Sequence, residues 1–140
     1  MIRISKLADY AVVILAEMAR QPAVVSTTAI AASTYLPETT VAKIMKSLTK
    51  ANILSATRGA TGGYQLLRAA DEISICDIIE AVDGPIGIVD CTEESRAQCQ
   101  ISNTCKLQSR WAPVNERVRA AISQTTLADM LAAHQPTKAA

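Results

Sequence analysis

The segment from residue 53 to residue 67 most constrains the fold of this 140-residue chain, because two β-prone runs there flank a glycine-rich link. The runs are Ile53–Arg58 and Tyr64–Leu67, and the link is Gly59-Ala60-Thr61-Gly62-Gly63. Glycines permit positive φ angles and let the backbone approach other groups closely. The runs and the link together predict a β-hairpin. Helical patterns account for most of the other segments, so the predicted fold class is mainly α with a small β-hairpin.

Two helices are predicted at the start of the chain. Residues 6–20 place their apolar side chains on one face of a 3.6-residue period, and Ser5 is the expected N-cap. Gln21-Pro22 ends this helix, because proline cannot continue it. A short helix is predicted over residues 29–33, with a threonine, Thr27 or Thr28, as its cap.

The third helix, predicted from Pro37 to about Ala51, has two distinct faces. Its apolar stripe consists of Val41, Ile44, Met45 and Leu48. Hydroxyl and lysine side chains occupy the other face. A short helix, a tight turn and a second helix with a small, polar and basic face form the helix-turn-helix arrangement. With the hairpin as its wing, the segment is predicted to be a winged helix-turn-helix.

Further helices are predicted after the hairpin. Ser74 caps a helix that ends at Asp83-Gly84-Pro85. Residues 86–104 show no sustained periodicity, which indicates a loop. A long helix is expected from about Cys105 to Gln124, and Thr126 caps a short helix after it. The apolar stripe of the long helix is too long for one small winged domain to cover, so we expect this helix to supply a dimer interface. The alternative is that it packs back on its own subunit.

These elements divide the chain into four parts. Residues 1–85 are the predicted winged domain, residues 86–104 the cysteine loop, residues 105–134 the dimerisation helix with the C-terminal helix, and residues 135–140 a disordered tail. No apolar run approaches the roughly 18 residues of a membrane span. The N-terminus lacks the apolar core of a signal peptide, so a cytoplasmic location without membrane contact is expected.

Charge is distributed unevenly along the chain, although the net charge is only +1. Residues 37–68 carry five Lys or Arg against one Glu, whereas residues 69–101 carry eight acids against one Arg. A basic region followed by an acidic one predicts a contact with an anionic partner that the total charge conceals. The alternative is a pair of ordinary solvated faces.

We therefore predict that the helix at residues 37–51 enters the major groove of double-stranded DNA. Hydroxyls can bond to base edges, lysines mainly neutralise phosphates, and the guanidinium of Arg58 offers a rigid fork for a groove contact. The candidate DNA-binding residues are Thr28, Thr39, Thr40, Lys43, Lys46, Arg58, Gly59 and Thr61. One helix in a groove binds weakly, so a homodimer that contacts two half-sites is expected.

Three of the four cysteines lie close together, as Cys91-x7-Cys99-x5-Cys105. In a reducing cytoplasm such cysteines indicate a metal site better than a disulfide framework. Thiolates suit zinc, Cu(I) and iron–sulfur clusters, but structural zinc usually has closely spaced pairs and four protein ligands. A cluster tolerates wider gaps, since its irons are spread over several ångströms. The alternative is three reduced, buried thiols without a metal.

A fourth ligand is not evident from the spacing. Cys76 lies in the first turn of the helix after Ser74, where a packing role is expected, and the single histidine, His134, lies near the far end of the chain. Oxygen and amide groups are therefore candidates, namely Asp90, Glu93, Glu94, Gln108 and Asp9.

These features together resemble the iron–sulfur winged-helix regulators that include IscR, NsrR, RirA and the regulators of SUF-type cluster-assembly operons. The resemblance covers nearly the whole chain. Its motifs are Leu7-Ala8-Asp9-Tyr10-Ala11, Arg58-Gly59-Ala60-Thr61-Gly62-Gly63-Tyr64 with Leu66, Ile78-Ile79-Glu80-Ala81-Val82-Asp83-Gly84-Pro85, the three cysteines and Thr126-Leu127-Ala128-Asp129-Met130. The start of the chain, together with Gly84-Pro85-Ile86, looks most like the SUF-system regulators.

The resemblance implies a homodimer that crosses through the long helix, with Cys91, Cys99 and Cys105 as thiolate ligands. The first gap between cysteines is seven residues here, where the family usually has five. Members like IscR have a histidine at the position of Gln108, and members like NsrR use an aspartate at the position of Asp9, contributed across the dimer. We favour Asp9 over Gln108 as fourth ligand and leave the cluster type open between [2Fe-2S] and [4Fe-4S].

The sequence thus predicts a DNA-binding repressor of iron–sulfur assembly genes that senses through its own cluster. One alternative is a nitric-oxide-responsive or iron-responsive repressor of the same family. A different class is a small redox or cluster-carrier protein. No nucleophile–base pair or phosphate loop is recognised, so an enzyme is not expected.

Overall fold

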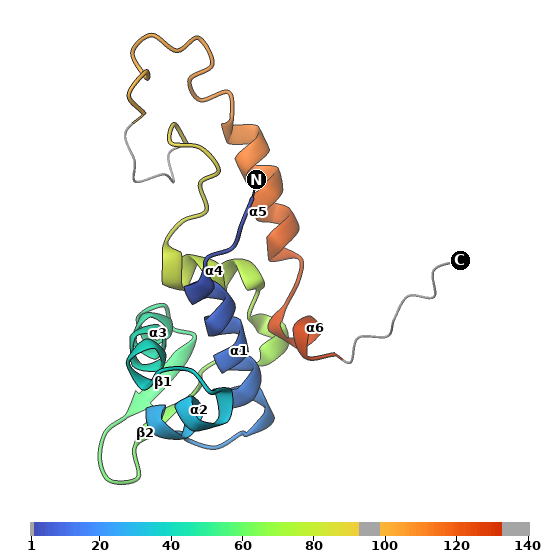
Figure 1. Cartoon of the computed structure of the whole chain (residues 1–140). Helices are drawn as coiled ribbons and strands as arrows, with labels where there is room; N and C mark the ends of the chain where they lie inside the picture. The colour runs from blue at the N-terminus through green and yellow to red at the C-terminus, as the bar shows by residue number, and fades with distance from the viewer. Residues whose placement is uncertain (1, 93–98, 133–140) are drawn as a thin grey trace.

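The computed structural model describes residues 2–92 and 99–132 of the chain (Figure 1). In chain order the elements are α1 (Lys6–Arg20), α2 (Thr27–Thr34), α3 (Glu38–Lys50), β1 (Leu54–Thr57), β2 (Gly63–Leu66), a 3-10 turn η1 (Ala70–Glu72), α4 (Ile75–Asp83), α5 (Ala112–Ser123) and α6 (Leu127–Leu131). The winged domain, α1–α4 with the β1–β2 hairpin, gathers at one end, and α5 extends away from it toward residues 99–111 at the other end. The predicted fold class, mainly α with a small β-hairpin, is confirmed.

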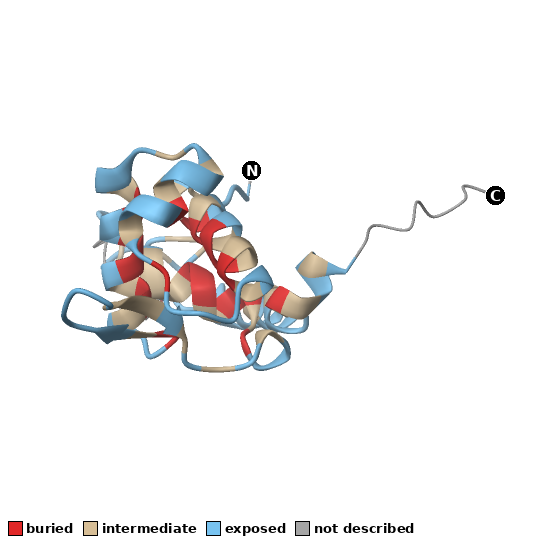
Figure 2. Cartoon of the chain, turned by 90° about the horizontal axis from the view of Figure 1, so that it is seen from below, coloured by how far each residue is buried: buried red, intermediate tan, exposed pale blue. Residues whose placement is uncertain are grey.

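The core lies where α1, α3 and α4 meet, and Figure 2 shows its buried residues in red on the inner sides of the helices. The apolar stripe predicted for α3 is fully buried there, with Val41, Ile44, Met45 and Leu48 at most 1% exposed. Helix α1 contributes its own stripe, including Ile14 and Leu15. Burial of side chains this size stabilises a fold by about 1.5–3 kcal/mol each, so this face fixes how α3 is oriented.

The wing is attached to the domain by more than its own pairing. Strands β1 and β2 are antiparallel, with Leu54 opposite Leu66 and Thr57 opposite Gly63. Val25, which precedes α2, bridges to Tyr64 through two backbone hydrogen bonds of 2.8 and 2.9 Å. The hairpin is therefore held in place relative to α2, as a wing must be to share a surface with the helix-turn-helix.

Helix caps confirm several predicted boundaries. The Ser5 hydroxyl accepts a hydrogen bond from the Ala8 amide at the start of α1, and it also donates to the Asp83 carboxylate (2.9 Å) at the end of α4. Ser74 and Asp77 form the reciprocal capping box of α4. Ser5 thus links the beginning of α1 to the end of α4.

Two helix starts differ from the prediction. Helix α2 begins at Thr27 and is capped by Ser26, whose hydroxyl accepts from the Ala29 amide (3.1 Å), so neither threonine is the cap. Helix α5 begins at Ala112, not near Cys105. Pro113 has no amide proton and its ring clashes with a helical carbonyl four residues earlier, so a helix cannot run into it from residue 105.

The two C-terminal helices are packed differently. Leu127 of α6 is fully buried in the core of the winged domain, and its amide donates to the Ile73 carbonyl (2.8 Å). On α5, by contrast, Trp111 just before the helix and Val114 within it remain 42% and 41% exposed. Among the described residues, no helix has the length and apolar character needed to cross a membrane.

Candidate nucleic-acid interface and cysteine loop

Helix α3 carries half of the predicted DNA-binding residues. Thr39, Lys43 and Lys46 are exposed, because the apolar stripe turns the opposite face inward. Thr40 is half-buried, so its hydroxyl is less accessible than that of Thr39. Pro37 is the N-cap residue, one position before the first turn that was predicted for it. The exposed side chains lie along one side of the helix, as a contact in a groove requires.

The first turns of α2 and α3 are joined by a side-chain hydrogen bond. The exposed Thr28 hydroxyl donates to the Glu38 carboxylate over 2.7 Å. Its proton is therefore used within the chain, while its oxygen can still accept. The bond holds the N-termini of the two helices together, and this pair of termini is what approaches DNA in a helix-turn-helix.

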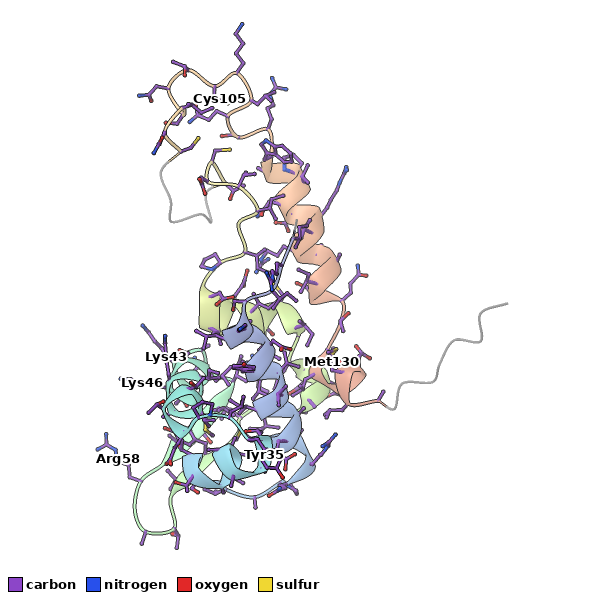
Figure 3. All side chains as sticks on the ribbon, viewed as in Figure 1. Tyr35, Lys43, Lys46, Arg58, Cys105 and Met130 are labelled. Carbon is purple, nitrogen blue, oxygen red and sulfur yellow. The ribbon has the colours of Figure 1, made fainter. Side chains whose placement is uncertain are left out.

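The wing presents the other predicted contacts. Arg58, Gly59 and Thr61 are exposed at its end. Gly59 has a φ of 113°, a conformation that favours glycine. In Figure 3, Arg58 points outward on the same side of the molecule as Lys43 and Lys46. The structure thus brings the basic residues of α3 and of the wing onto one surface.

Tyr35 is an exposed aromatic residue that the sequence pattern does not predict. This residue ends α2 with a left-handed backbone (φ 58°), and its side chain is 94% exposed in the turn before α3. A bulky residue with a positive φ is uncommon, and glycine or asparagine is the usual sequence signal for this conformation. Neither is present at this position, so the sequence gives no sign of an exposed aromatic ring beside the helix-turn-helix.

The three cysteines of the predicted cluster site are free, half-buried thiols. They lie in the loop between α4 and α5, which contains only turns and bends in its described part. Cys105 lies at the opposite end of the molecule from Arg58 (Figure 3). Within residues 2–92 and 99–132, no three His, Cys, Asp or Glu side chains lie close enough together to hold a metal ion. The single chain therefore does not bring the three thiols together.

The candidates for a fourth ligand are dispersed. Asp9 is exposed in the first turn of α1, where it lines a pocket of about 320 Å³ with Ile79 and Met130. Asp90 and Gln108 are exposed in the cysteine loop. Glu93, Glu94 and His134 lie outside the described residues.

Cys76 is separate from the trio. It is 1% exposed on α4, and burial raises the pKa of its thiol above the ordinary value. A neutral, buried thiol behaves as a small apolar side chain, in agreement with the packing role expected for it.

Comparisons with known proteins identify the family. The family model for Rrf2, described as an iron-dependent transcriptional regulator, matches residues 4–133. This chain belongs to the Rrf2 family. An rrf2-like HTH-type transcriptional regulator of Rhodobacter capsulatus is 33% identical over 128 residues, which cover 87% of this chain and 85% of that protein. An HTH-type transcriptional regulator of Mycobacterium tuberculosis is 31% identical over 131 residues, covering 91% and 80% of the two chains.

Solved structures of Rrf2 regulators share the fold. CymR of B. subtilis, a global cysteine regulator, superposes with a TM-score of 0.69 and 28% identity over 94% of this chain and 97% of its own. IscR of T. potens gives a TM-score of 0.64 and 26% identity over 93% and 86%. The chain is therefore an Rrf2-family helix-turn-helix transcriptional regulator and not an enzyme. The alternative of a small redox or cluster-carrier protein finds no support in these comparisons.

Proposed function

We propose that this Rrf2 regulator is a repressor of iron–sulfur cluster assembly genes whose affinity for DNA depends on its own iron–sulfur cluster. The observation that carries the proposal is the presence of three thiols, Cys91, Cys99 and Cys105, in one loop of a winged fold whose family is described as iron-dependent. The SUF-type target rests on the resemblance of residues 4–10 and 84–86 to regulators of those operons.

On DNA, the outer face of α3 enters the major groove and the wing follows the adjacent backbone. Thr28, Thr39 and Thr40 supply hydroxyls near the base edges, and Lys43 and Lys46 neutralise phosphates. Arg58, Gly59 and Thr61 form the contact of the wing. The common orientation of Lys43, Lys46 and Arg58 in Figure 3 supports one continuous contact surface.

The donor set of the loop fits an iron–sulfur cluster. Thiolates are soft ligands, so they bind iron more favourably than they bind hard cations. A loop of turns can rearrange around a ligand at a lower free-energy cost than a helix or strand. Cys91, Cys99 and Cys105 would hold the cluster, which when bound makes the protein responsive to iron supply and to oxidative or nitrosative damage. Asp9 of a second chain is our choice for the fourth ligand, since it is exposed and lies on the winged domain.

The active form is a homodimer. Trp111 and Val114 leave apolar surface exposed along α5, and this surface continues into a groove of about 650 Å³ lined by Ile86, Ile88 and Val118. An apolar helix face of this kind is covered by a second copy of the same helix in a symmetric dimer. If Asp9 of the second chain is a ligand, it connects the cluster directly to the DNA-binding domain. Cluster binding changes DNA affinity only if the DNA-bound and free conformations bind the cluster with different affinities, and this contact would provide such a difference.

Anaerobic purification tests the cofactor. We expect a coloured protein with iron and sulfide in the cysteine-containing loop, and loss of both when the cysteines are replaced by serine. Mössbauer spectra of the wild type and of Asp9→Ala test the fourth ligand, and a changed iron environment is expected. A colourless, iron-free protein that binds DNA identically with and without oxygen would exclude cluster sensing, and unchanged spectra would exclude Asp9.

A further inference from the structure

Helix α5 buries one polar residue against residues 86–88, the stem of the cysteine loop. Within Ala112–Ser123 only Asn115 is buried, at 1% exposure. Its side-chain oxygen accepts a hydrogen bond from the Ile88 amide (3.0 Å), and its side-chain nitrogen donates to the Ile86 carbonyl (2.9 Å). A buried amide must have its hydrogen bonds satisfied, and both partners here belong to one stretch of main chain. That stretch ends three residues before Cys91.

A second contact joins the same face of α5 to the winged domain. Arg119 follows Asn115 by four residues, so the two side chains lie on one side of the helix. Its guanidinium donates two hydrogen bonds to the Glu80 carboxylate on α4, Nε to Oε1 at 2.8 Å and Nη2 to Oε2 at 3.1 Å. This paired geometry restricts orientation as well as distance. The same contact holds the pKa of Glu80 below its ordinary value.

Helix α4 is in turn part of the winged domain. It packs against α1 and against α3, the helix that carries the predicted DNA contacts. Ser5 at the start of α1 also donates to Asp83 at the end of α4. A displacement of α4 therefore shifts α3, because a closely packed interior has little free space to absorb it.

We propose that Asn115 and the Glu80–Arg119 pair form a two-point connection through α5, which sets the position of the cysteine loop relative to α3. Asn115 fixes the stem of the loop to the helix, and Arg119 fixes the helix to α4. This inference rests on the proposed function, because it assigns these three side chains as positioning residues that link ligand binding at the cysteines to DNA affinity. Two sites are coupled when both shift the same structural element between two positions. Helix α5 contacts the cysteine loop through Asn115 and the winged domain through Arg119, so it meets this requirement.

The test uses the full-length dimer and DNA from upstream of its own gene. Operator affinity is measured anaerobically for the iron–sulfur-loaded protein and for the same protein after chelation, and the ratio of the two affinities is the readout. For the wild type we expect a ratio of about tenfold or more. In Asn115→Ala and in Arg119→Ala, the affinities of the loaded and the chelated protein should differ by less than about threefold. The iron and sulfide content per chain should stay unchanged. Arg117→Ala is the matched control, since Arg117 is exposed on α5 and makes no ion pair within the described residues.

Failure of the connection and failure of cluster sensing give different results. A wild-type ratio that persists in both variants overturns the connection and leaves the proposed function standing. A wild-type ratio of one overturns cluster sensing, and amide hydrogen exchange of the cluster-free proteins then decides on the connection. If the connection exists, Asn115→Ala and Arg119→Ala should each speed amide hydrogen exchange in α3 and α4. Faster exchange only near residue 88 or within α5 would overturn the connection. Arg119 is partly exposed, so its variant is expected to fold even if the Asn115 variant does not.

Discussion

Gly62 in the wing shows how closely a single position can be constrained. A Cβ atom placed there would lie 2.2 Å from the Thr57 carbonyl oxygen, a backbone atom that cannot rotate away. We predict that Gly62→Ala lowers the free energy of unfolding by about 1–3 kcal/mol, the usual cost of overpacking. Urea unfolding followed by circular dichroism measures it. Ala60→Ser, an exposed change in the same turn, should stay within about 0.5 kcal/mol of the wild type, and equal stability of both variants would contradict the prediction.

Arg58 is the residue on which the proposed wing contact depends most. Removal of its exposed guanidinium in Arg58→Ala should weaken operator binding by about 1–3 kcal/mol, while the fold is unaffected. Arg58→Lys retains the charge but not the planar fork, so it should restore binding to nonspecific DNA more than binding to the operator. Fluorescence anisotropy with both DNAs measures this. Operator affinity equal to wild type in Arg58→Ala would remove Arg58 from the interface.

The Glu80–Arg119 pair between α4 and α5 makes stability depend on pH. The hydrogen bonds from Arg119 lower the pKa of Glu80. The pair therefore contributes its full stabilisation at pH values above the ordinary glutamate pKa of about 4.3. This stabilisation is lost as the pH falls through the lowered pKa of Glu80. Glu80→Gln should cost on the order of 1 kcal/mol at pH 7, because the pair is partly exposed.

The difference in unfolding free energy between the wild type and Glu80→Gln should shrink as the pH is lowered below about 4.3. Chemical unfolding at a series of pH values measures this difference. Asp71→Asn is the control, since Asp71 is exposed and makes no ion pair within the part of the chain that the structure describes. A difference that grows with acidity would contradict the assigned role of the pair.

Elements with their own local signals were predictable from the sequence. The stripe of α3, the Ser74 cap of α4 and the glycine-rich turn of the wing all follow from local residue patterns, and each is found as expected. The predicted start of α5 near Cys105 is wrong, because the helix begins at Ala112 and Pro113 prevents a helix from running into it from residue 105. The bonds of Asn115 to Ile86 and Ile88 could not be predicted, because they join residues 29 and 27 positions apart and have no local signature.

The exposed apolar face of α5 is the proposed dimer interface. Val114 is 41% exposed on that face. We predict that Val114→Asp weakens the dimer at least about tenfold, since a charge there would be buried without a counterion in the complex. Sedimentation equilibrium measures the change. Glu116→Gln, an exposed change elsewhere on α5, should leave the dimer intact, and an unchanged dimer in Val114→Asp would exclude this face as the interface.

The proposed cysteine site is defined by the sequence as a set of residues but not as a geometry. Spacing along the chain identified Cys91, Cys99 and Cys105, yet a loop without helix or strand in its described part fixes no mutual arrangement of their thiols. Asp9 lies on another element altogether, and its assignment depends on a second chain. If the ligands come from this loop and from a second chain, as proposed, their arrangement depends on dimer assembly, and local sequence patterns carry no information about it.

We propose that occupancy of the cysteine site controls binding to DNA. The most direct measurement is an anaerobic titration of operator DNA with one preparation of the dimer before and after chelation, beside the Cys91→Ser/Cys99→Ser/Cys105→Ser variant. We predict operator affinities that differ by about tenfold or more between the two wild-type forms, and a variant that behaves as the chelated form under both conditions. Equal affinities in the two wild-type forms, matched by the variant, would contradict the claim.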